Sequence, residues 1–239
     1  MSLRQTLEGL FDTARISFPT VADSLRGPVP RAVTEQRLAW WTAKLLRDAE
    51  VDLEVRGREH AGDGSEAMLV MSNHQSLYDI PVLYQSLPGS LRMVAKAELF
   101  RTPVWGRAMI AAGFIRIDRD DRQQAVESLR ATGGALLASG TRVWIAPEGT
   151  RCKTGVLGPF KSGGFRMALD FGVRILPVAI DGTRNVLPAT GWIVEKGKHV
   201  TVTVLPPIDP KEYGVERRKE LMAEVRRAIA GGLGQTLTA

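Results

Sequence analysis

The hydrophobic positions of this chain fall into short continuous runs separated by stretches with helical spacing. Seven short runs rich in apolar and β-branched residues predict strands. These runs are Asp52–Arg56, Met68–Ser72, Arg92–Ala95, Phe114–Ile117, Val143–Ala146, Ile175–Ala179 and Val200–Val204. Helices are predicted after His74 and at Thr102–Ala111, Arg122–Ser139 and Gly164–Phe171. Because strands alternate with helices, we expect an α/β fold with a single mixed sheet flanked by helices.

Two amphipathic helices are predicted ahead of the first strand. Their apolar residues with helical spacing are Leu3, Leu7, Leu10, Phe11, Ala14 and Phe18, and then Leu38, Trp41 and Leu45. The pair Trp40–Trp41, with basic residues nearby, is typical of a helix at a membrane interface. The alternative is that both apolar faces pack on the rest of the protein. We predict membrane contact foremost for Thr34–Glu50, with residues 1–50 as the interfacial helices and residues 51–239 as an αβ domain.

The composition limits the class of protein. The chain has 239 residues, of which 44% are hydrophobic, so it can bury the core of one large domain. No segment approaches the roughly 20 consecutive apolar residues of a membrane-spanning helix. Charged residues also interrupt the N-terminal stretch where a secretory signal would have its apolar core. The single cysteine, Cys152, excludes an intramolecular disulfide and suits a reducing compartment.

The net charge of +6 suits an anionic partner. Nucleic acid is not expected, because the sequence has no helix-turn-helix spacing, zinc ligands or aromatic stacking strip. No metal site is predicted, since the three histidines lie far apart and have no cysteine nearby. The basic residues near the C-terminus lie on a predicted packing helix with Leu221, Val225 and Ile229 on its apolar face. Anionic lipid headgroups are therefore the expected partner of this positive charge.

The strongest chemical signal is the segment Asn73–Asp79, in which a histidine precedes an aspartate by five positions. Histidine titrates near neutrality and can take a proton and return it. A carboxylate bonded to one ring nitrogen fixes the tautomer and leaves the other nitrogen free to act as a base. Residues five apart in one helix point roughly 140° away from each other. The pair can therefore meet only if His74 lies at or before the helix start and Asp79 lies inside the helix.

Three further segments follow in order: Gly113–Arg119, Ala146–Arg151 and Ile175–Ile180. Together with Asn73–Asp79, they resemble the four ordered blocks of the glycerolipid acyltransferase family, and most closely those of the bacterial lysophosphatidic acid acyltransferases. The resemblance covers roughly Leu53 to Pro207. Its Pro-Glu-Gly-Thr-Arg block is itself uncommon, which makes the match specific. The family fold that it implies is a mixed αβ domain with the blocks lining one face.

The resemblance implies a role for each block. His74 is implied as the general base and Asp79 as its orienting partner. The residues implied to hold the acceptor's phosphate and glycerol are Arg119, Glu148, Gly149 and Arg151, and Arg116, Thr150 and Lys96 complete the candidate substrate-binding set. The strand Ile175–Ile180 is implied to shape the acyl side of the site. Arg116 is an additional cation in the second block, so either arginine of that block can meet the phosphate.

Elementary chemistry agrees with these roles. The planar guanidinium of arginine matches the oxygens of a phosphate, and Gly149, which has no Cβ, would let the backbone approach a ligand closely. Backbone N–H groups at the start of the helix after His74 are the candidate donors to an oxyanion. Other interpretations of the same residues stay open. Glu148 and Arg151 can pair with each other across a turn, and Lys96, without the family context, is a typical surface lysine.

We therefore expect a peripheral enzyme at the cytoplasmic face of the membrane. It would move a fatty acyl group from a co-substrate, acyl-CoA or acyl-carrier protein, to the free hydroxyl of lysophosphatidic acid, giving phosphatidic acid without a cofactor. The alternatives are a lipid-binding module without turnover, an acyltransferase for another lysolipid such as a lyso aminolipid, and a hydrolase that uses Ser72 or Ser76. The hydrolase is disfavoured because neither serine lies in a Gly-x-Ser-x-Gly elbow. Cys152 is not expected to be a nucleophile.

Overall fold

The computed structural model describes residues 3–118 and 121–236. Its strands are β1 (Asp52–Arg56), β2 (Leu69–Ser72), β3 (Leu91–Lys96), β4 (Ile115–Ile117), β5 (Arg142–Ile145), β6 (Ile175–Asp181) and β7 (His199–Val204). Its α-helices are α1 (Leu3–Ser24), α2 (Arg31–Asp48), α3 (Asp79–Ser86), α4 (Trp105–Ala111), α5 (Arg122–Ser128), α6 (Gly134–Ala138), α7 (Gly163–Phe171), α8 (Thr183–Val186) and α9 (Arg218–Gly232). Each predicted strand is found, with its ends within two residues of the prediction.

The described strands form one sheet in the order β1-β7-β6-β2-β5-β3-β4. The neighbours from β6 to β4 pair parallel. β1 and β7 are parallel to each other, and β7 pairs antiparallel with β6. In the central strand, Leu69 lies opposite Val143 of β5 on one side and Ile175 of β6 on the other. The expected α/β fold with a mixed sheet and flanking helices is confirmed.

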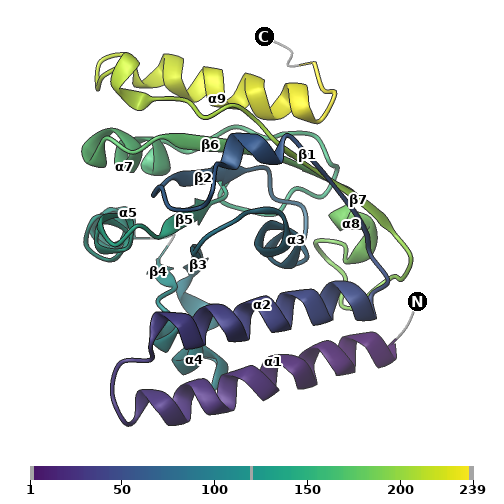
Figure 1. Ribbon diagram of the computed structural model, residues 1–239. Coiled ribbons are helices and arrows are strands. Elements are labelled where there is room, and N and C mark those ends of the chain that lie inside the picture. Colours follow the sequence, from purple (N-terminus) through teal and green to yellow (C-terminus); the bar gives the residue numbers. More distant parts are fainter. Residues whose placement is uncertain (1–2, 119–120, 237–239) are drawn as a thin grey trace.

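Successive residues of each strand face opposite layers, as the two-residue period of a strand requires. On β2, Leu69 and Met71 pack into the core beneath α7 and α9, whereas Val70 packs into the core beneath α3. In Figure 1, α5 and α7 lie at the left of the molecule, α3 lies to the right of β3 and β5, and α9 crosses the top. His74 follows β2 on the α3 side, because Ser72 shares the face of Val70.

Two helix starts and one helix differ from the prediction. The helix expected from Thr102 begins at Trp105, since Val104 has a φ of 62°, which is not helical. The helix after His74 begins only at Asp79. The short α8 was not predicted. The helix expected through the pair Gly133–Gly134 is confirmed: α5, a π-helical turn (Leu129–Gly133) and α6 run continuously over residues 122–138.

α1 and α2 lie side by side along the bottom of the molecule (Figure 1). α2 packs on α3, and α1 packs on α2 and α4. Between the two helices, the indole N–H of Trp41 donates to the hydroxyl of Thr13 at 3.0 Å. The guanidinium of Arg15 lies over Trp40 at 4.9 Å. Both tryptophans of α2 therefore contact α1, which matches the alternative of packing on the rest of the protein, and membrane contact by Thr34–Glu50 stays a prediction.

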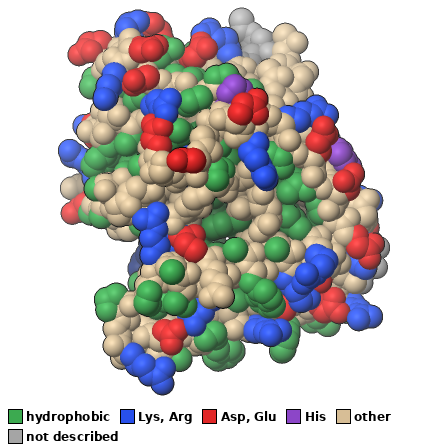
Figure 2. All heavy atoms as spheres, viewed as in Figure 1, with side chains coloured by type: hydrophobic (Ala, Val, Ile, Leu, Met, Phe, Trp, Pro, Cys, Tyr) green, Lys and Arg blue, Asp and Glu red, His purple; other side chains and the backbone are tan. Residues whose placement is uncertain are grey.

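α1 has an unusual distribution of side chains. Its buried residues are polar: Asp12, Ser17 and Thr20. Its apolar residues face outward, with exposed fractions between 57% and 68%: Leu3, Leu7, Leu10, Phe11 and Phe18. Figure 2 shows hydrophobic side chains gathered on the lower part of the molecule, where this helix lies. None of the described helices is long and apolar enough to cross a bilayer. The division of the chain at residue 50 stays a prediction.

Candidate active site

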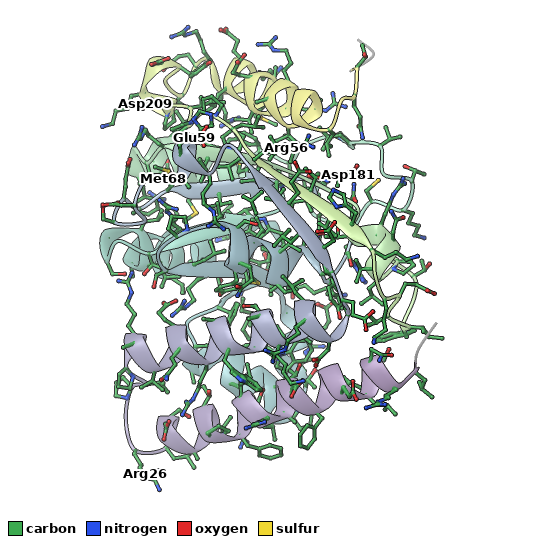
Figure 3. All side chains as sticks on the ribbon, turned by 45° about the vertical axis from the view of Figure 1, so that its right-hand side comes forward. Arg26, Arg56, Glu59, Met68, Asp181 and Asp209 are labelled. Atoms are coloured by element: carbon green, nitrogen blue, oxygen red, sulfur yellow. The ribbon has the colours of Figure 1, made fainter. Side chains whose placement is uncertain are left out.

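The candidate residues gather at the carboxyl ends of the parallel strands, where ligands bind in open α/β sheets. Figure 3 labels Met68, just before β2, and Asp181, the last residue of the neighbouring β6, at opposite ends of these two strands. His74 lies at the Asp181 end, in the loop between β2 and α3, and Asp79 is the first residue of α3. The expected geometry is therefore confirmed. The Nδ1 atom of His74 lies 2.6 Å from Oδ2 of Asp79.

The Asp79 carboxylate is completely buried and accepts hydrogen bonds from several directions. Its Oδ2 atom accepts from the backbone N–H groups of Gln75, at 2.7 Å, and Ser76, at 3.1 Å. Its Oδ1 atom accepts from the hydroxyl of Thr183 at 2.5 Å. The N–H groups of Gln75 and Ser76, which precede α3, therefore bond to Asp79, and the oxyanion donors at the helix start stay a prediction. The carboxylate is held in place to orient the imidazole.

The residues around His74 fix its backbone and its ring. The Asn73 side chain donates to the carbonyl of Ile180 at 2.7 Å and accepts from its N–H at 2.8 Å, which ties the loop to β6. The ring of Trp144 lies edge-on to that of His74, with centroids 5.5 Å apart. The indole N–H of Trp144 in turn donates to Ser72 at 2.9 Å. One nitrogen of the imidazole therefore contacts Asp79, and the ring of Trp144 packs beside the imidazole.

Glu148 supports the same loop from the third block. Its carboxylate accepts from the backbone N–H of His74 and from that of Gly158, each at 2.9 Å. The side chain is 7% exposed, and burial raises the pKa of Glu148 above its ordinary value, while these two N–H groups oppose the rise. The alternative in which Glu148 pairs with Arg151 is not the contact found. Glu148 is thus a positioning residue for the His74 backbone.

The rest of the third block surrounds this contact. Gly149 has a φ of 72°, and a Cβ there would lie 2.9 Å from Nζ of Lys161, so the absence of a side chain makes room for this lysine. Thr150 is exposed. The N–H of Cys152 donates to the carbonyl of His74 at 2.6 Å, which holds the preceding Arg151 beside the histidine loop.

Two of the basic candidates, Lys96 ahead of the second block and Arg116 within it, lie further along the sheet. Lys96 and Arg116 are exposed, on β3 and β4. Lys96 lies opposite Ile117, and Arg116 opposite Ala95, so the two cations project to opposite faces of the sheet. Lys96 is also 3.5 Å from Glu98. Arg116 shares the face of Ala95, which is the α3 side. Arg119 lies outside the described residues.

An apolar groove of about 350 Å³ opens between α1 and the loops that follow His74 and β6. Its walls include Leu10, Leu45, Leu77, Tyr78, Pro81, Leu187 and Val194. Among the described residues that line it, Arg151 is the charged one. A smaller cavity of about 90 Å³ continues it between α1, α2 and α4, and both are bordered by Thr13, Trp41, Leu77, Ile80 and Trp105. The apolar side chains that line the groove suit the binding of a fatty chain.

The two candidate nucleophiles of the hydrolase alternative are engaged elsewhere. The hydroxyl of Ser76 is fully buried and donates to the carbonyl of Leu187 at 2.7 Å. The hydroxyl of Ser72 donates to the carbonyl of Asn73 at 2.8 Å. The thiol of Cys152 donates to the carbonyl of Val156 at 3.0 Å. None of these three contacts places a nucleophile on His74.

Sequence reasoning missed Thr183 and Trp144, which touch the two members of the pair directly. Thr183 is 104 positions from Asp79, and Trp144 is 70 positions from His74. No local pattern links residues so distant. The available signal was indirect: both follow or lie within strands that neighbour β2.

Most of the chain is similar in sequence to known acyltransferases. The family model described as Acyltransferase matches residues 52–181. A chloroplast 1-acyl-sn-glycerol-3-phosphate acyltransferase from Brassica napus is 34% identical over 177 residues, which are 74% of this chain and 49% of that protein. The 1-acyl-sn-glycerol-3-phosphate acyltransferase of Salmonella typhimurium is 32% identical over 158 residues, 66% of this chain and 63% of that protein. Less than two thirds of either relative's length is therefore matched.

The fold is also similar to that of a solved structure. The crystal structure of the 1-acyl-sn-glycerophosphate (LPA) acyltransferase PlsC from Thermotoga maritima matches with a TM-score of 0.80 and 26% sequence identity. That match covers 99% of this chain and 98% of the other. It includes the two N-terminal helices together with the sheet.

Proposed function

Because this chain belongs to the acyltransferase family, we propose that it transfers a fatty acyl group from acyl-CoA or acyl-carrier protein to lysophosphatidic acid, giving phosphatidic acid. The observation that carries the proposal is the 2.6 Å contact between His74 and Asp79 beside an apolar groove. The names of the relatives and of the matching structure support the choice of acceptor.

The chemistry follows from the orientation of the imidazole. With its Nδ1 proton held by Asp79, His74 presents Nε2 as a base. Nε2 takes the proton of the acceptor hydroxyl while the hydroxyl oxygen attacks the thioester carbonyl. The new C–O bond forms, and the carbonyl electron pair moves onto oxygen. When the oxyanion collapses, the C–S bond breaks and the departing thiolate takes the proton from His74. Acyl transfer thus returns the base to its starting state.

The groove supports the proposed placement of the substrates. An acyl chain buried in it gains roughly 0.8 kcal/mol for each CH₂ removed from water. Arg151, the charged residue of the wall, suits a phosphate at the polar end of the groove. Substrate contacts by Lys96, Arg116, Arg119, Gly149 and Thr150 stay proposals. For Glu148, the contact with the His74 backbone favours a supporting role.

A two-tailed product requires access to a bilayer. We propose that α1 docks on the cytoplasmic face of the membrane through its outward apolar face, with the groove beside it open to lipid. The support is the exposure of Leu7 and Phe11 on a helix whose buried side is polar. An amphipathic helix of this kind lies in the interface rather than across it.

The proposed reaction is tested with purified protein, lysophosphatidic acid and either thioester donor. Wild type should release thiol in an acceptor-dependent way and form a diacyl product. His74→Ala should lower the rate by roughly 10²–10⁴, the usual contribution of a general base. The matched control is His199→Ala, since His199 is exposed and contacts Asp52 at the far edge of the sheet.

Each alternative has its own outcome in this assay. Equal thiol release by wild type and His74→Ala would exclude His74 as the base. No turnover with either donor, combined with vesicle binding that survives the substitution, would favour the lipid-binding module. Turnover with a lyso aminolipid but not with lysophosphatidic acid would reassign the acceptor.

A further inference from the structure

A second cavity, of about 190 Å³, adjoins the apolar groove and differs from it in character. Its lining includes Lys153, Arg184, Asn185 and Thr190, and we call it the basic pocket. Thr190 and the preceding residue, Ala189, line both the basic pocket and the groove. A substrate that lies in the groove can therefore place a polar group in the basic pocket.

The two cations of the basic pocket are not neutralised by carboxylates. No aspartate or glutamate is among the described residues that line it. Within residues 3–118 and 121–236, Lys153 has no ion pair, and its side chain is exposed. Arg184 donates from Nη1 to the carbonyl of Thr154 at 2.5 Å, which leaves its other N–H groups available. The basic pocket therefore has unused positive charge and donors.

The walls of the basic pocket are joined to the catalytic pair. Cys152, which precedes Lys153, donates its N–H to the carbonyl of His74 at 2.6 Å. Thr183, which precedes Arg184, donates to Asp79 at 2.5 Å. Both cations are thus one residue from a direct contact with the pair. Their backbone positions relative to the reacting centre are therefore fixed by those contacts.

A glycine leaves room for the guanidinium of Arg184. Gly155 has a φ of +85°, and a Cβ there would collide with Nη1 of Arg184. The absence of a side chain at Gly155 therefore leaves room for the guanidinium next to the loop that carries Lys153. The two cations approach the cavity from two different segments, the loop after β5 and the helix after β6.

We propose that the basic pocket is a phosphate subsite that binds a phosphate ester of a substrate. This inference rests on the proposed acyl transfer, in which both substrates carry phosphate: the acceptor, and the pantetheine arm of the thioester donor. Arginine and lysine without carboxylates nearby are the groups that proteins use for phosphate. Asn185 and Thr190 add neutral donors.

Either phosphate-bearing substrate is a source of this group. Arg184 follows β6, on one side of the central strand β2, and Lys153 follows β5, on the other side. The basic pocket therefore spans the carboxyl end of β2, where the catalytic pair lies, and assays with each substrate distinguish the two sources.

The test uses Lys153→Gln and Arg184→Gln, with Lys219→Gln as the control, since Lys219 is exposed on α9 across the sheet. If the basic pocket holds the donor's phosphate, the KM for acyl-CoA should rise about 10-fold in each variant, as expected for a lost hydrogen bond to a charged group. With S-acyl-N-acetylcysteamine, a thioester without phosphate, the variants should equal wild type. Lys219→Gln should leave both donors unaffected.

The acceptor arm separates the two sources. A rise confined to the KM for lysophosphatidic acid, absent with 1-monoacylglycerol, would assign the subsite to the acceptor's phosphate. Unchanged KM values for both phosphate-bearing substrates would overturn the proposal. So would a loss of the same size with both phosphate-free analogues.

Binding without turnover separates this proposal from the proposed function. CoA and glycerol 3-phosphate are titrated calorimetrically into wild type, Lys153→Gln and Lys219→Gln. Weaker binding of either probe by Lys153→Gln alone would support the subsite even if wild type transferred no acyl group. Equal affinity of all three proteins for both probes would overturn it. Lys153 is exposed and makes no ion pair with a described residue, so this variant is expected to fold as wild type does.

Discussion

At the scale of single residues, the carboxylate of Asp79 depends on a partner far away in the chain. Thr183 is completely buried, and its hydroxyl donates to Oδ1 of Asp79 at 2.5 Å. The other oxygen of Asp79 faces His74 and two backbone N–H groups. A buried carboxylate that loses one of these donors has no water to replace it. We therefore expect Thr183 both to stabilise the fold and to hold Asp79 against His74.

Thr183→Val preserves the shape of the side chain and removes the donor. We expect the free energy of unfolding to fall by about 1–3 kcal/mol, the cost of an unsatisfied buried group, and kcat to fall while the KM for lysophosphatidic acid stays within the error. Chemical denaturation and steady-state kinetics measure the two effects. Thr203→Val, at a half-buried position of β7, is the control and should change neither. A Thr183→Val enzyme with wild-type stability and kcat would contradict this role.

At the scale of elements, the long helix over residues 122–138 shows how packing can overrule helix propensity. Gly133 and Gly134 weaken a helix in isolation, by roughly 0.5–1 kcal/mol each relative to alanine. Here a Cβ at Gly133 would collide with Cε of Met167, which is itself buried in α7. A Cβ at Gly134 would collide with the ring of Phe171. The glycine pair therefore allows this helix to lie close against α7.

Two alanine substitutions separate propensity from packing. Gly133→Ala should lower the free energy of unfolding by about 1–2 kcal/mol, because overpacking a buried contact costs more than propensity returns. Gly231→Ala, in α9, meets no atom within 4 Å and should raise it by roughly 0.5–1 kcal/mol. Thermal or urea unfolding of the two variants provides the comparison. Equal shifts in the same direction would show that propensity alone decides.

At the scale of the whole molecule, the orientation of α1 leaves an apolar face on the surface. Its polar residues face α2 and α4, and its apolar residues are left on the surface next to the groove. An exposed apolar face of this kind marks an interaction site. We place the bilayer against it, so that a lysolipid can enter the groove without crossing water.

Phe11→Glu should weaken binding to anionic lipid vesicles by roughly tenfold or more, because burial of a phenylalanine contributes about 1.5–3 kcal/mol. Phe11 is 68% exposed, so the fold should tolerate the change. Val215→Glu introduces the same charge at a position that is 61% exposed, ahead of α9, and is the matched control. Vesicle flotation measures the bound fraction. Identical flotation of the two variants would place the membrane elsewhere.

Local sequence patterns predict the strands of the sheet, the α/β class and the meeting of His74 with Asp79. These depend on short-range information. A strand such as β2 is recognisable because all four of its residues are apolar or small and buried on both sides. His74 and Asp79 are five positions apart, so the geometry of one loop and one helix start decides whether they meet. The helical spacing of α1 was equally readable.

Long-range packing sets which face of each helix stays exposed and which distant groups meet at the site. Periodicity locates the apolar side of α1 and α2 but does not tell which side the rest of the protein covers. Thr183, Trp144 and the carboxylate of Glu148 reach the pair because β5 and β6 flank β2, and strand order is set by long-range pairing. Contacts across 70 or more positions have no local signature, since their energy appears only when the chain has folded.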